Sequence, residues 1–293
     1  MTLATFLIQC LNSLQYGLLL FLVASGLTLI FGVMGVINLA HGSFYMVGAY
    51  LAYGLAAPVA AATGGGFFTT LALGLVLALA LGWLLEWAFF SFLYERDHLQ
   101  QVLMTYGLIL VFEELRSLAV GDDVHGVEVP PALAGSIALG STMAYPVYRL
   151  FVSAVCIVLA VAMYLVFSRT KIGMKVRAGA ANREMLQSLG VDVRLLYRAV
   201  FAVGVAVAVL AGMVAAPVSS VYPGMGASVL IVCFVVVVIG GIGSIRGALA
   251  AALLIGFVDT FGKVLLPQAS GVLVYLLMAL ILLWRPEGLF RSS

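Results

Sequence analysis

The first 85 residues of the chain contain no Asp, Glu, Lys or Arg. An ordinary soluble domain has about one charged residue in four, so a segment of this kind would not stay in water. Across all 293 residues, 64% are hydrophobic and 9% are charged. No basic leading region precedes the first apolar stretch, which is therefore expected to remain as a membrane helix and not to be removed as a secretory signal. The composition predicts an all-α protein that crosses a membrane many times.

The length of the chain limits the number of crossings. A spanning helix needs about 20 apolar residues, so at most about ten crossings fit and no room remains for a soluble catalytic domain. Segment 227–239 has 13 residues, which is short for a span and predicts a half-helix or a re-entrant segment. We expect one transmembrane domain over residues 1–293, with eight or nine helices. The apolar segments are 5–31, 36–59, 67–94, 99–120, 145–167, 198–218, 227–239, 248–266 and 271–284.

The basic residues indicate the orientation, because short cytoplasmic loops are enriched in Lys and Arg. Segment 169–198 contains seven basic residues against Glu184 and Asp192, which places it in the cytoplasm. The carboxyl end, with Arg285 and Arg291, is expected on the same side. Segment 121–131 carries three acidic residues and no basic one, so it is expected outside. Counting back places the amino terminus outside, which requires an odd number of crossings.

Net charge and cysteine usage exclude several other classes. A net charge of +2 does not provide an extended surface for nucleic acid. Cys10, Cys156 and Cys233 lie singly in apolar runs, so neither a disulfide nor a metal site is indicated. The sequence contains no Walker A, HExxH or GxSxG motif, which argues against an intramembrane enzyme and against a nucleotide site in this chain.

Four polar residues share one face of the first expected helix, because they are spaced at i, i+3, i+4 and i+7. Such a face does not suit lipid. The side chains either hydrogen-bond to neighbouring helices, at about 1 kcal/mol each, or line a path for a solute. They form the first part of a candidate substrate pathway: Gln9, Asn12, Ser13 and Tyr16.

Residues 31–50 place glycines and polar side chains between two hydrophobic stretches, so the backbone is expected to bend or unwind there. Transporters place broken helices beside the solute path. Asn38, His41 and Ser43 therefore complete the candidate pathway. Two roles are open for His41, a proton relay or a structural hydrogen bond in the interrupted helix, and the lack of a nearby acidic residue favours the structural role.

Two further glycine-rich stretches, 222–226 and 240–247, are expected to interrupt helices. The second (GGIGSIRG) is not a dinucleotide loop, because Arg246 occupies the third glycine position. Like residues 32–48, it joins two apolar runs through a glycine-rich turn. This similarity hints at an internal repeat of the kind found in transporters.

A few ionisable residues fall within the apolar segments, where a charge at the helix centre costs about 3 kcal/mol. Some have the i, i+3 or i, i+4 spacing of same-helix ion pairs, and most lie near the outer ends of their helices. We expect them at the membrane interface, with Glu86 in an aromatic belt formed by Trp83 and Trp87. The residues are Glu86, Glu113, Glu114, Arg116, Arg149, Asp259 and Lys263.

Within the basic loop, residues 175–198 predict a short amphipathic helix. Asn182 can cap its start, and Gly190 suits the left-handed position after its end. Met185, Leu186 and Leu189 would form a short apolar stripe. The helix would either lie on lipid headgroups or dock onto a cytoplasmic partner.

Three stretches in this chain resemble one family. They are LTLIFGVMGVINLAHGSFYMVGAY at 27–50, RAGAANREMLQSLGVDVRLLYRAVFAVGVAVAVLAG at 177–212, and YPGMG at 222–226 followed by VVVIGGIGSIRGALAAALLIG at 236–256. The chain resembles bacterial branched-chain amino acid ABC transporter permeases of the LivH type, whose pattern is shared with urea and amide permeases. The resemblance covers nearly the whole chain in matching order.

The resemblance implies an ABC importer permease fold in the bacterial inner membrane. Its implied partners are a second permease subunit of the LivM type, two cytoplasmic ABC ATPase subunits and a periplasmic solute-binding protein. ATP and Mg would bind the ATPase subunits, and this chain would bind no cofactor. The implied solute is a branched-chain or other hydrophobic amino acid, with urea, amides or aromatic carboxylates as alternatives. The implied ATPase-coupling residues are Ala181, Asn182, Arg183, Glu184, Met185, Leu186 and Gly190.

A self-sufficient secondary transporter is the main rival interpretation. Broken helices suit that class, but ion coupling usually needs carboxylates or carbonyl cages in the middle of the membrane. The sequence places no acidic residue deep in an expected span, which favours the ATP-driven importer.

Overall fold

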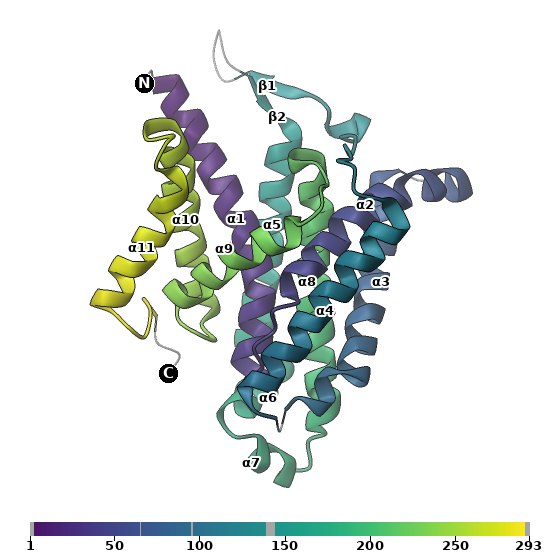
Figure 1. The fold of residues 1–293 in the computed structure, drawn as a ribbon, viewed down its shortest axis with the longest axis vertical. Helices are drawn as coiled ribbons and strands as arrows, with labels where there is room; N and C mark the ends of the chain where they lie inside the picture. Colours follow the sequence, from purple (N-terminus) through teal and green to yellow (C-terminus); the bar gives the residue numbers. More distant parts are fainter. Residues whose placement is uncertain (1–2, 65, 95, 139–143, 291–293) are drawn as a thin grey trace.

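The computed structural model describes residues 3–64, 66–94, 96–138 and 144–290. Eleven α-helices make up most of this part of the chain (Figure 1). The helices are α1 (Leu3–Met34), α2 (His41–Thr63), α3 (Phe67–Ala88), α4 (His98–Val120), α5 (Val147–Arg169), α6 (Lys171–Ala181), α7 (Arg183–Ser188), α8 (Val193–Ser219), α9 (Met225–Gly240), α10 (Ile245–Leu265) and α11 (Ser270–Trp284). Short 3₁₀ turns, η1 (Phe90–Phe92) and η2 (Pro131–Leu133), follow α3 and α4.

All nine apolar segments expected from the sequence form helices, which confirms a helical polytopic membrane protein. Within the described residues, six helices are long and apolar enough to cross a membrane: α1, α2, the α3–η1 unit, α5, α8 and α10. Helix α4 has the length of a span but carries Glu113, Glu114 and Arg116 near its end. The other two apolar helices, α9 and α11, are shorter, with 16 and 15 residues.

Helices α1 and α8 form the centre of the bundle. In the most apolar 18-residue stretch of each helix, 78% of the residues of α1 and 83% of those of α8 are buried. The corresponding share is 17% in α5 and 28% in the α3–η1 unit. A helix that is apolar on all sides and also buried must be surrounded by other helices. The outer helices expose Leu, Val and Phe side chains in the manner of a lipid-facing surface.

Small residues let the central helices approach closely. A Cβ atom added at Gly48 of α2 would meet the carbonyl oxygen of Val209 in α8, and one added at Gly212 would meet the carbonyl oxygen of Tyr45. Where α1 crosses α8, a Cβ at Gly26 would lie 2.6 Å from the carbonyl oxygen of Gly204. Interfaces of this kind are held by van der Waals contact between backbones, because lipid offers no hydrophobic driving force between helices.

The expected helix breaks are confirmed. Between α1 and α2 the chain turns at 35–40, with Gly35 at φ +66°, and between α9 and α10 it turns at Gly241 and Gly243, with φ of +92° and +78°. The two turns touch, because a Cβ at Gly32 would lie 2.6 Å from the Cα of Gly243. The two segments that hinted at a repeat in the sequence are therefore neighbours in space.

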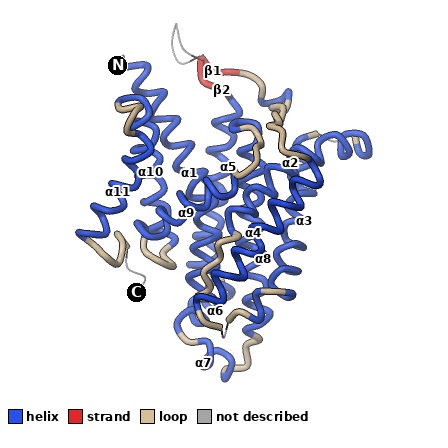
Figure 2. The backbone as a smooth tube through the Cα atoms, viewed as in Figure 1, coloured by secondary structure: helices blue, strands red, loops and turns tan. Residues whose placement is uncertain are grey.

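The two ends of the molecule differ (Figures 1 and 2). At one end lie the start of α1 and a short antiparallel hairpin, β1 (Ser136–Ala138) and β2 (Ala144–Pro146), which the all-α prediction did not include. We call this the hairpin end. At the opposite end lie α6 and α7, which we call the loop end.

Segment 121–131 lies at the hairpin end. Arg116 pairs with Asp122 at 2.9 Å and with Glu113 at 3.1 Å, and its Nη1 donates to the carbonyl oxygen of Gly121 at 2.7 Å. The guanidinium therefore supplies a hydrogen-bond donor at the end of α4, where carbonyl groups lack helical partners. The hydrogen bond from Arg116 also lowers the pKa of Asp122.

Candidate functional site

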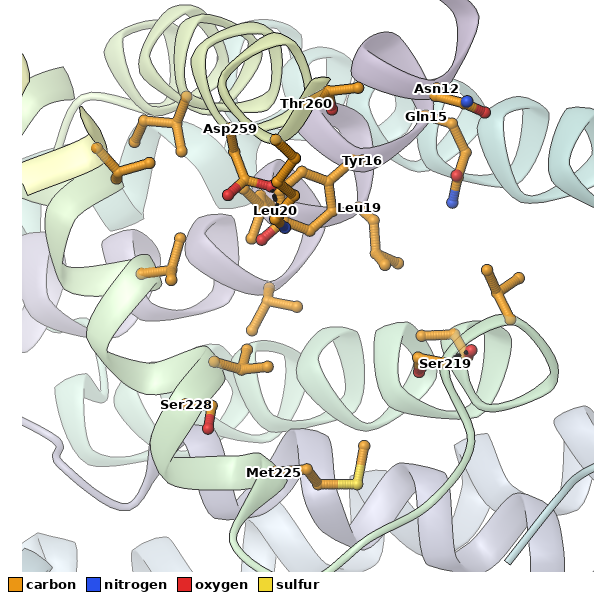
Figure 3. Close-up of a pocket in the computed structure, with 18 of the residues that line it drawn as sticks. Asn12, Gln15, Tyr16, Leu19, Leu20, Ser219, Met225, Ser228, Asp259 and Thr260 are labelled. Carbon is orange, nitrogen blue, oxygen red and sulfur yellow. Dashed lines mark hydrogen bonds and ion pairs between the residues drawn. The ribbon is translucent and has the colours of Figure 1, made fainter. Parts of the chain in front are cut away.

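A cavity of about 710 Å³ opens between helices near the hairpin end. We call it the hairpin-side cavity. Most of its wall comes from the first half of α1, the end of α8, the start of α9 and the end of α10, with parts of α5 and α11. Figure 3 shows Asn12, Gln15, Tyr16 and Asp259 on one side of this space and Ser219, Met225 and Ser228 on the other. The volume falls within the range of small-molecule pockets, about 300–1,000 Å³.

The chemistry of the wall changes along α1. Polar side chains lie nearer the hairpin end, where Gln9, Asn12 and Tyr16 line the cavity. Further along α1 the lining is apolar, with Leu19, Leu20 and Val23. Apolar residues of α8, α9 and α10 continue this part of the wall: Ala215, Val218, Val229, Val232 and Ile255. A solute with one polar and one apolar end would therefore find both kinds of surface.

Arg149, at the start of α5, places a guanidinium in the cavity wall. Its Nη1 donates a hydrogen bond of 2.7 Å to Oδ1 of Asn12, and Nδ2 of Asn12 donates to Oε1 of Gln9 at 3.3 Å. In the described part of the chain no carboxylate pairs with Arg149. The guanidinium is hydrogen-bonded to a neutral amide. It keeps its charge and has other N–H donors that can bind an anion.

A second charged group lines the cavity from α10. Nζ of Lys263 lies 2.6 Å from Oδ2 of Asp259, and the ammonium stands 5.6 Å from the ring centroid of Tyr16. The pair confirms the spacing argument made from the sequence. With Arg149, Lys263 and Asp259 in one wall, the described lining carries a net charge of +1.

The candidate pathway residues divide into two groups. Gln9, Asn12 and Tyr16 line the hairpin-side cavity. Ser13 lies on the same helix face but is fully buried, and its hydroxyl donates to the carbonyl oxygen of Gln9 at 2.7 Å. It packs against α10, where a Cβ at Gly256 would lie 2.6 Å from the carbonyl oxygen of Ser13.

The structure places Asn38, His41 and Ser43 outside the lining of the hairpin-side cavity, in the buried break between α1 and α2. Oδ1 of Asn38 accepts a hydrogen bond of 3.0 Å from the Ala40 amide, and Nε2 of His41 donates to the carbonyl oxygen of Val23 at 2.9 Å. These contacts brace the interrupted helix and favour the structural role of His41. A part in the solute path stays a prediction for these three residues.

The loop end contains the segment that the sequence associates with ATPase coupling. Asn182 caps α7, its Oδ1 accepting from the Met185 amide at 2.9 Å, and Gly190 follows the helix at φ +80°. Both local predictions are confirmed. Leu186 is buried, whereas Met185 and Leu189 are 63% and 71% exposed, so the expected apolar stripe divides between the protein interior and the surface.

Arg183 connects α7 to its neighbours. Its guanidinium lies 5.5 Å from the ring centroid of Tyr94 and 5.7 Å from that of Tyr197. Ala181, Asn182 and Glu184 are exposed around it. A force on α7 would therefore reach both α8 and the chain between α3 and α4.

The expected place of Glu86 in an aromatic belt is wrong. Its side chain is fully buried, 2.6 Å from Nε of Arg198 and 2.7 Å from the hydroxyl of Tyr94. Trp83 and Trp87 are exposed as expected, and the Arg198 guanidinium lies over the Trp83 ring at 5.4 Å. The cause is tertiary packing, because the partner charge comes from another helix and cancels the cost of burying the carboxylate.

Sequence reasoning also missed three cavity residues. Arg149, Asp259 and Lys263 were expected near the outer ends of their helices at the membrane interface, and the structure adds that they line the hairpin-side cavity. The sequence did contain a signal for this cavity, because the three residues lie at the ends of two helices that reach the same side of the membrane. Charges at the same depth on several helices can line one cavity. Which helices are neighbours could not be read from one sequence.

A helical membrane protein with a polar cavity between its spans belongs to the class of membrane transport proteins. The comparison with known families is specific. Residues 9–282 match the family model described as the permease component of the branched-chain amino acid transport system. The chain belongs to this family of permeases, which confirms the resemblance stated from its motifs.

Relatives of known description match over almost the whole chain. The high-affinity branched-chain amino acid transport system permease protein BraD of Pseudomonas aeruginosa is 28% identical over 97% of this chain and 95% of its own length. LivH of Escherichia coli K12, described in the same words, is 27% identical over the same shares of both chains. A probable LivH of Methanocaldococcus jannaschii is 28% identical over 95% of this chain and 90% of its own. No solved structure matches the chain.

Proposed function

We propose that this chain is one of the two permease subunits of an ATP-driven importer and that the hairpin-side cavity receives the solute. The observation that carries this proposal is the cavity itself, which lies near the hairpin end and has polar residues towards that end and an apolar wall further along α1. A binding protein would deliver the solute at this end. In this proposal, the structure would represent the outward-facing state of an alternating-access cycle.

The lining favours a carboxylate with an apolar side chain. The net charge of +1 attracts a carboxylate to Arg149, and Asp259 offers an acceptor to an ammonium group. The apolar wall suits a branched hydrocarbon. Relatives named as branched-chain amino acid permeases agree with this chemistry. Urea and simple amides, which have no charge and no hydrocarbon chain, use neither feature.

The bundle is closed beyond the cavity. Gly26 and Gly204 bring α1 and α8 into backbone contact, and the ring of His41 fills the space beside them, since a Cβ at Gly26 would lie 3.0 Å from its Cε1. Transport would then require α1 and α8 to separate at this level. The movement would open the path towards the loop end.

Coupling to ATP hydrolysis would occur through α7. Met185 and Leu189 present apolar side chains to a partner, and Arg183 transmits movement to Tyr94 and Tyr197. Two ATPase subunits, which would hold ATP and Mg, would dock at the loop end of this chain and of a LivM-type second permease subunit. A solute-binding protein would complete the assembly.

The loop end would face the cytoplasm and the hairpin end the outside of a bacterial inner membrane. The charge distribution supports this orientation, with Lys171, Lys175 and Arg177 at the loop end and Asp122 and Asp123 at the hairpin end. The amino terminus would be outside and the carboxyl terminus inside.

The test is uptake into proteoliposomes that contain the complete transporter and its binding protein. We expect leucine to enter only with ATP and binding protein present, and urea not to enter. Changing Arg183 and Glu184 together to Ala should abolish uptake while the complex still assembles, and Gln187→Ala with Ser188→Ala on the same helix should have little effect. ATP-independent uptake would overturn the proposal.

A further inference from the structure

A second cavity, of about 630 Å³, lies at the loop end between the α3–α4 connection and the first turns of α7 and α8. We call it the arginine pocket. Four of its eight lining residues are arginines, and the described lining contains no carboxylate. The pocket is lined by Trp87, Ser91, Phe92, Tyr94, Arg96, Arg183, Arg194 and Arg198.

One wall of the arginine pocket is braced by buried contacts. Arg198 is held by Glu86 at 2.6 Å, and the other oxygen of Glu86 accepts from Tyr94 at 2.7 Å. The ring of Tyr94 packs edge-on against Tyr197, with 5.3 Å between centroids, and both rings contact Arg183. The guanidinium groups on this wall are therefore positioned in advance, which lowers the cost of ordering them around an anion.

The opposite wall leaves positive charge unbalanced. Among the described residues, the side chains of Arg96 and Arg194 form no ion pair, and both are exposed. Glu86 pairs with Arg198 on the other wall and does not reach these two arginines. Arginine binds phosphate oxygens through two parallel hydrogen bonds, so several converging guanidinium groups favour a phosphate over a single carboxylate.

The rim of the pocket indicates where the phosphate comes from. Trp87 and Phe92 line the pocket and are 59% and 70% exposed. They lie at the end of the α3–η1 unit, which is mostly exposed, and aromatic side chains at the end of a span mark the boundary between hydrocarbon and headgroups. A ligand whose phosphate enters the arginine pocket would therefore lay its apolar part against these rings.

We propose that the arginine pocket binds the phosphate of an anionic phospholipid, with its acyl chains against Trp87 and Phe92. Basic pockets between membrane helices on the cytoplasmic side are suited to such headgroups. Because Arg183 belongs both to this pocket and to α7, the bound lipid would hold the segment that contacts the ATPase. The inference does not depend on which solute the transporter carries.

The test uses the complete transporter, purified in detergent and mixed with phosphatidylglycerol or phosphatidylcholine. Native mass spectrometry measures how much of each lipid stays bound. We expect tight binding of phosphatidylglycerol only. Arg96→Gln with Arg194→Gln should weaken it about tenfold or more, because each basic residue near the surface contributes about 1 kcal/mol. The control Lys171→Gln with Lys175→Gln removes the same charge from exposed positions of α6 and should bind as the wild type does.

Additional measurements distinguish a lipid phosphate from a soluble phosphate and from a docked protein. Arg96→Lys with Arg194→Lys should restore lipid binding, because the charge is kept. Equal retention of both lipids, or equal loss in the Lys171 and Lys175 control, would overturn the proposal. Displacement of the lipid by millimolar pyrophosphate would assign the pocket to a soluble phosphate. Loss of the ATPase subunits from the Arg96 and Arg194 variant with its lipid unchanged would assign the pocket to protein docking.

Discussion

The hairpin-side cavity and the arginine pocket both hold arginine, but in opposite settings. In the cavity, Arg149 lies between helices and donates a hydrogen bond to the Asn12 amide, while Asp259 and Lys263 pair with each other in the same lining. In the arginine pocket, four guanidinium groups line one space at the loop end, and Arg198 pairs there with the buried Glu86. Helices surround the first site, which suits a small solute, whereas the second lies beside exposed aromatic side chains and can accept a headgroup that remains in its membrane. Position relative to the helices therefore decides what a cation can bind.

Both sites depend on close packing of the central helices, and Gly48→Leu should disrupt this packing most. The added side chain would meet the backbone of Val209 and force α2 away from α8. The cost should exceed the about 1–3 kcal/mol of ordinary overpacking, because backbone cannot move aside as a side chain can. We expect little monodisperse protein in size-exclusion chromatography.

The matched control is Gly54→Leu in the same helix. A Cβ at Gly54 meets nothing within 4 Å, so this variant should fold and elute as the wild type does. Normal yield and thermal stability for Gly48→Leu would show that the tight α2–α8 contact does not hold the bundle together.

The next largest effect is expected at the anchor of the arginine pocket. Glu86→Gln would leave the Arg198 guanidinium without its counter-charge. Breaking a fully buried pair costs about 3–5 kcal/mol, and the cost here should be somewhat lower because the Arg198 side chain keeps 23% exposure. Thermal unfolding in detergent measures it, with Glu114→Gln, an exposed carboxylate on α4, as the control. An equal drop in melting temperature for both variants would show that the Glu86–Arg198 pair has no special part in stability.

Arg149→Gln tests the role of the guanidinium in the hairpin-side cavity. Losing a charge-assisted hydrogen bond to a carboxylate costs about 1.5–3 kcal/mol, so leucine uptake at saturating binding protein should fall at least about tenfold. Arg149→Lys keeps the charge and should restore part of the rate. Wild-type uptake by Arg149→Gln would exclude the guanidinium from solute binding.

The smallest effect is expected at the hairpin end, outside the cavity. Asp122→Asn removes the charge that faces Arg116, in a pair whose carboxylate is exposed. Because the folded state lowers the pKa of Asp122, its contribution is present at neutral pH and disappears as the pH falls through that lowered value. We expect a melting temperature lower by about 1 °C at neutral pH, and no difference in strong acid. A difference that persists in acid would point to packing instead.

Local features of this molecule could be predicted from its sequence, and contacts between distant helices could not. The cap at Asn182, the left-handed Gly190 and the Asp259–Lys263 pair each depend on residues a few positions apart, where helix geometry fixes the distance. The helix breaks likewise follow from glycines within short stretches. Such features are decided by the chain itself.

The cavity required knowledge of which helices are neighbours. Arg149 meets Asn12 across 137 positions of sequence, and Glu86 meets Arg198 across 112. Periodicity identified the polar face of α1 but not the helices opposite it. Placing Asn38, His41 and Ser43 beside Gln9 and Tyr16 assumed that polar residues in broken helices gather in one space, whereas the structure separates them.

The distance along the chain between Glu86 and Arg198 also has a consequence for synthesis. At about 5–20 residues per second, a ribosome needs about 6–22 s to add the 112 positions that separate the two residues. During that interval α3 enters the membrane with a carboxylate whose counter-ion does not yet exist. The carboxylate must take up a proton or stay among the headgroups until α8 arrives. The contact that fastens α3 in the finished protein is thus one of the later ones to form, and the rate of translation through α4 and α5 sets how long the nascent chain waits for it.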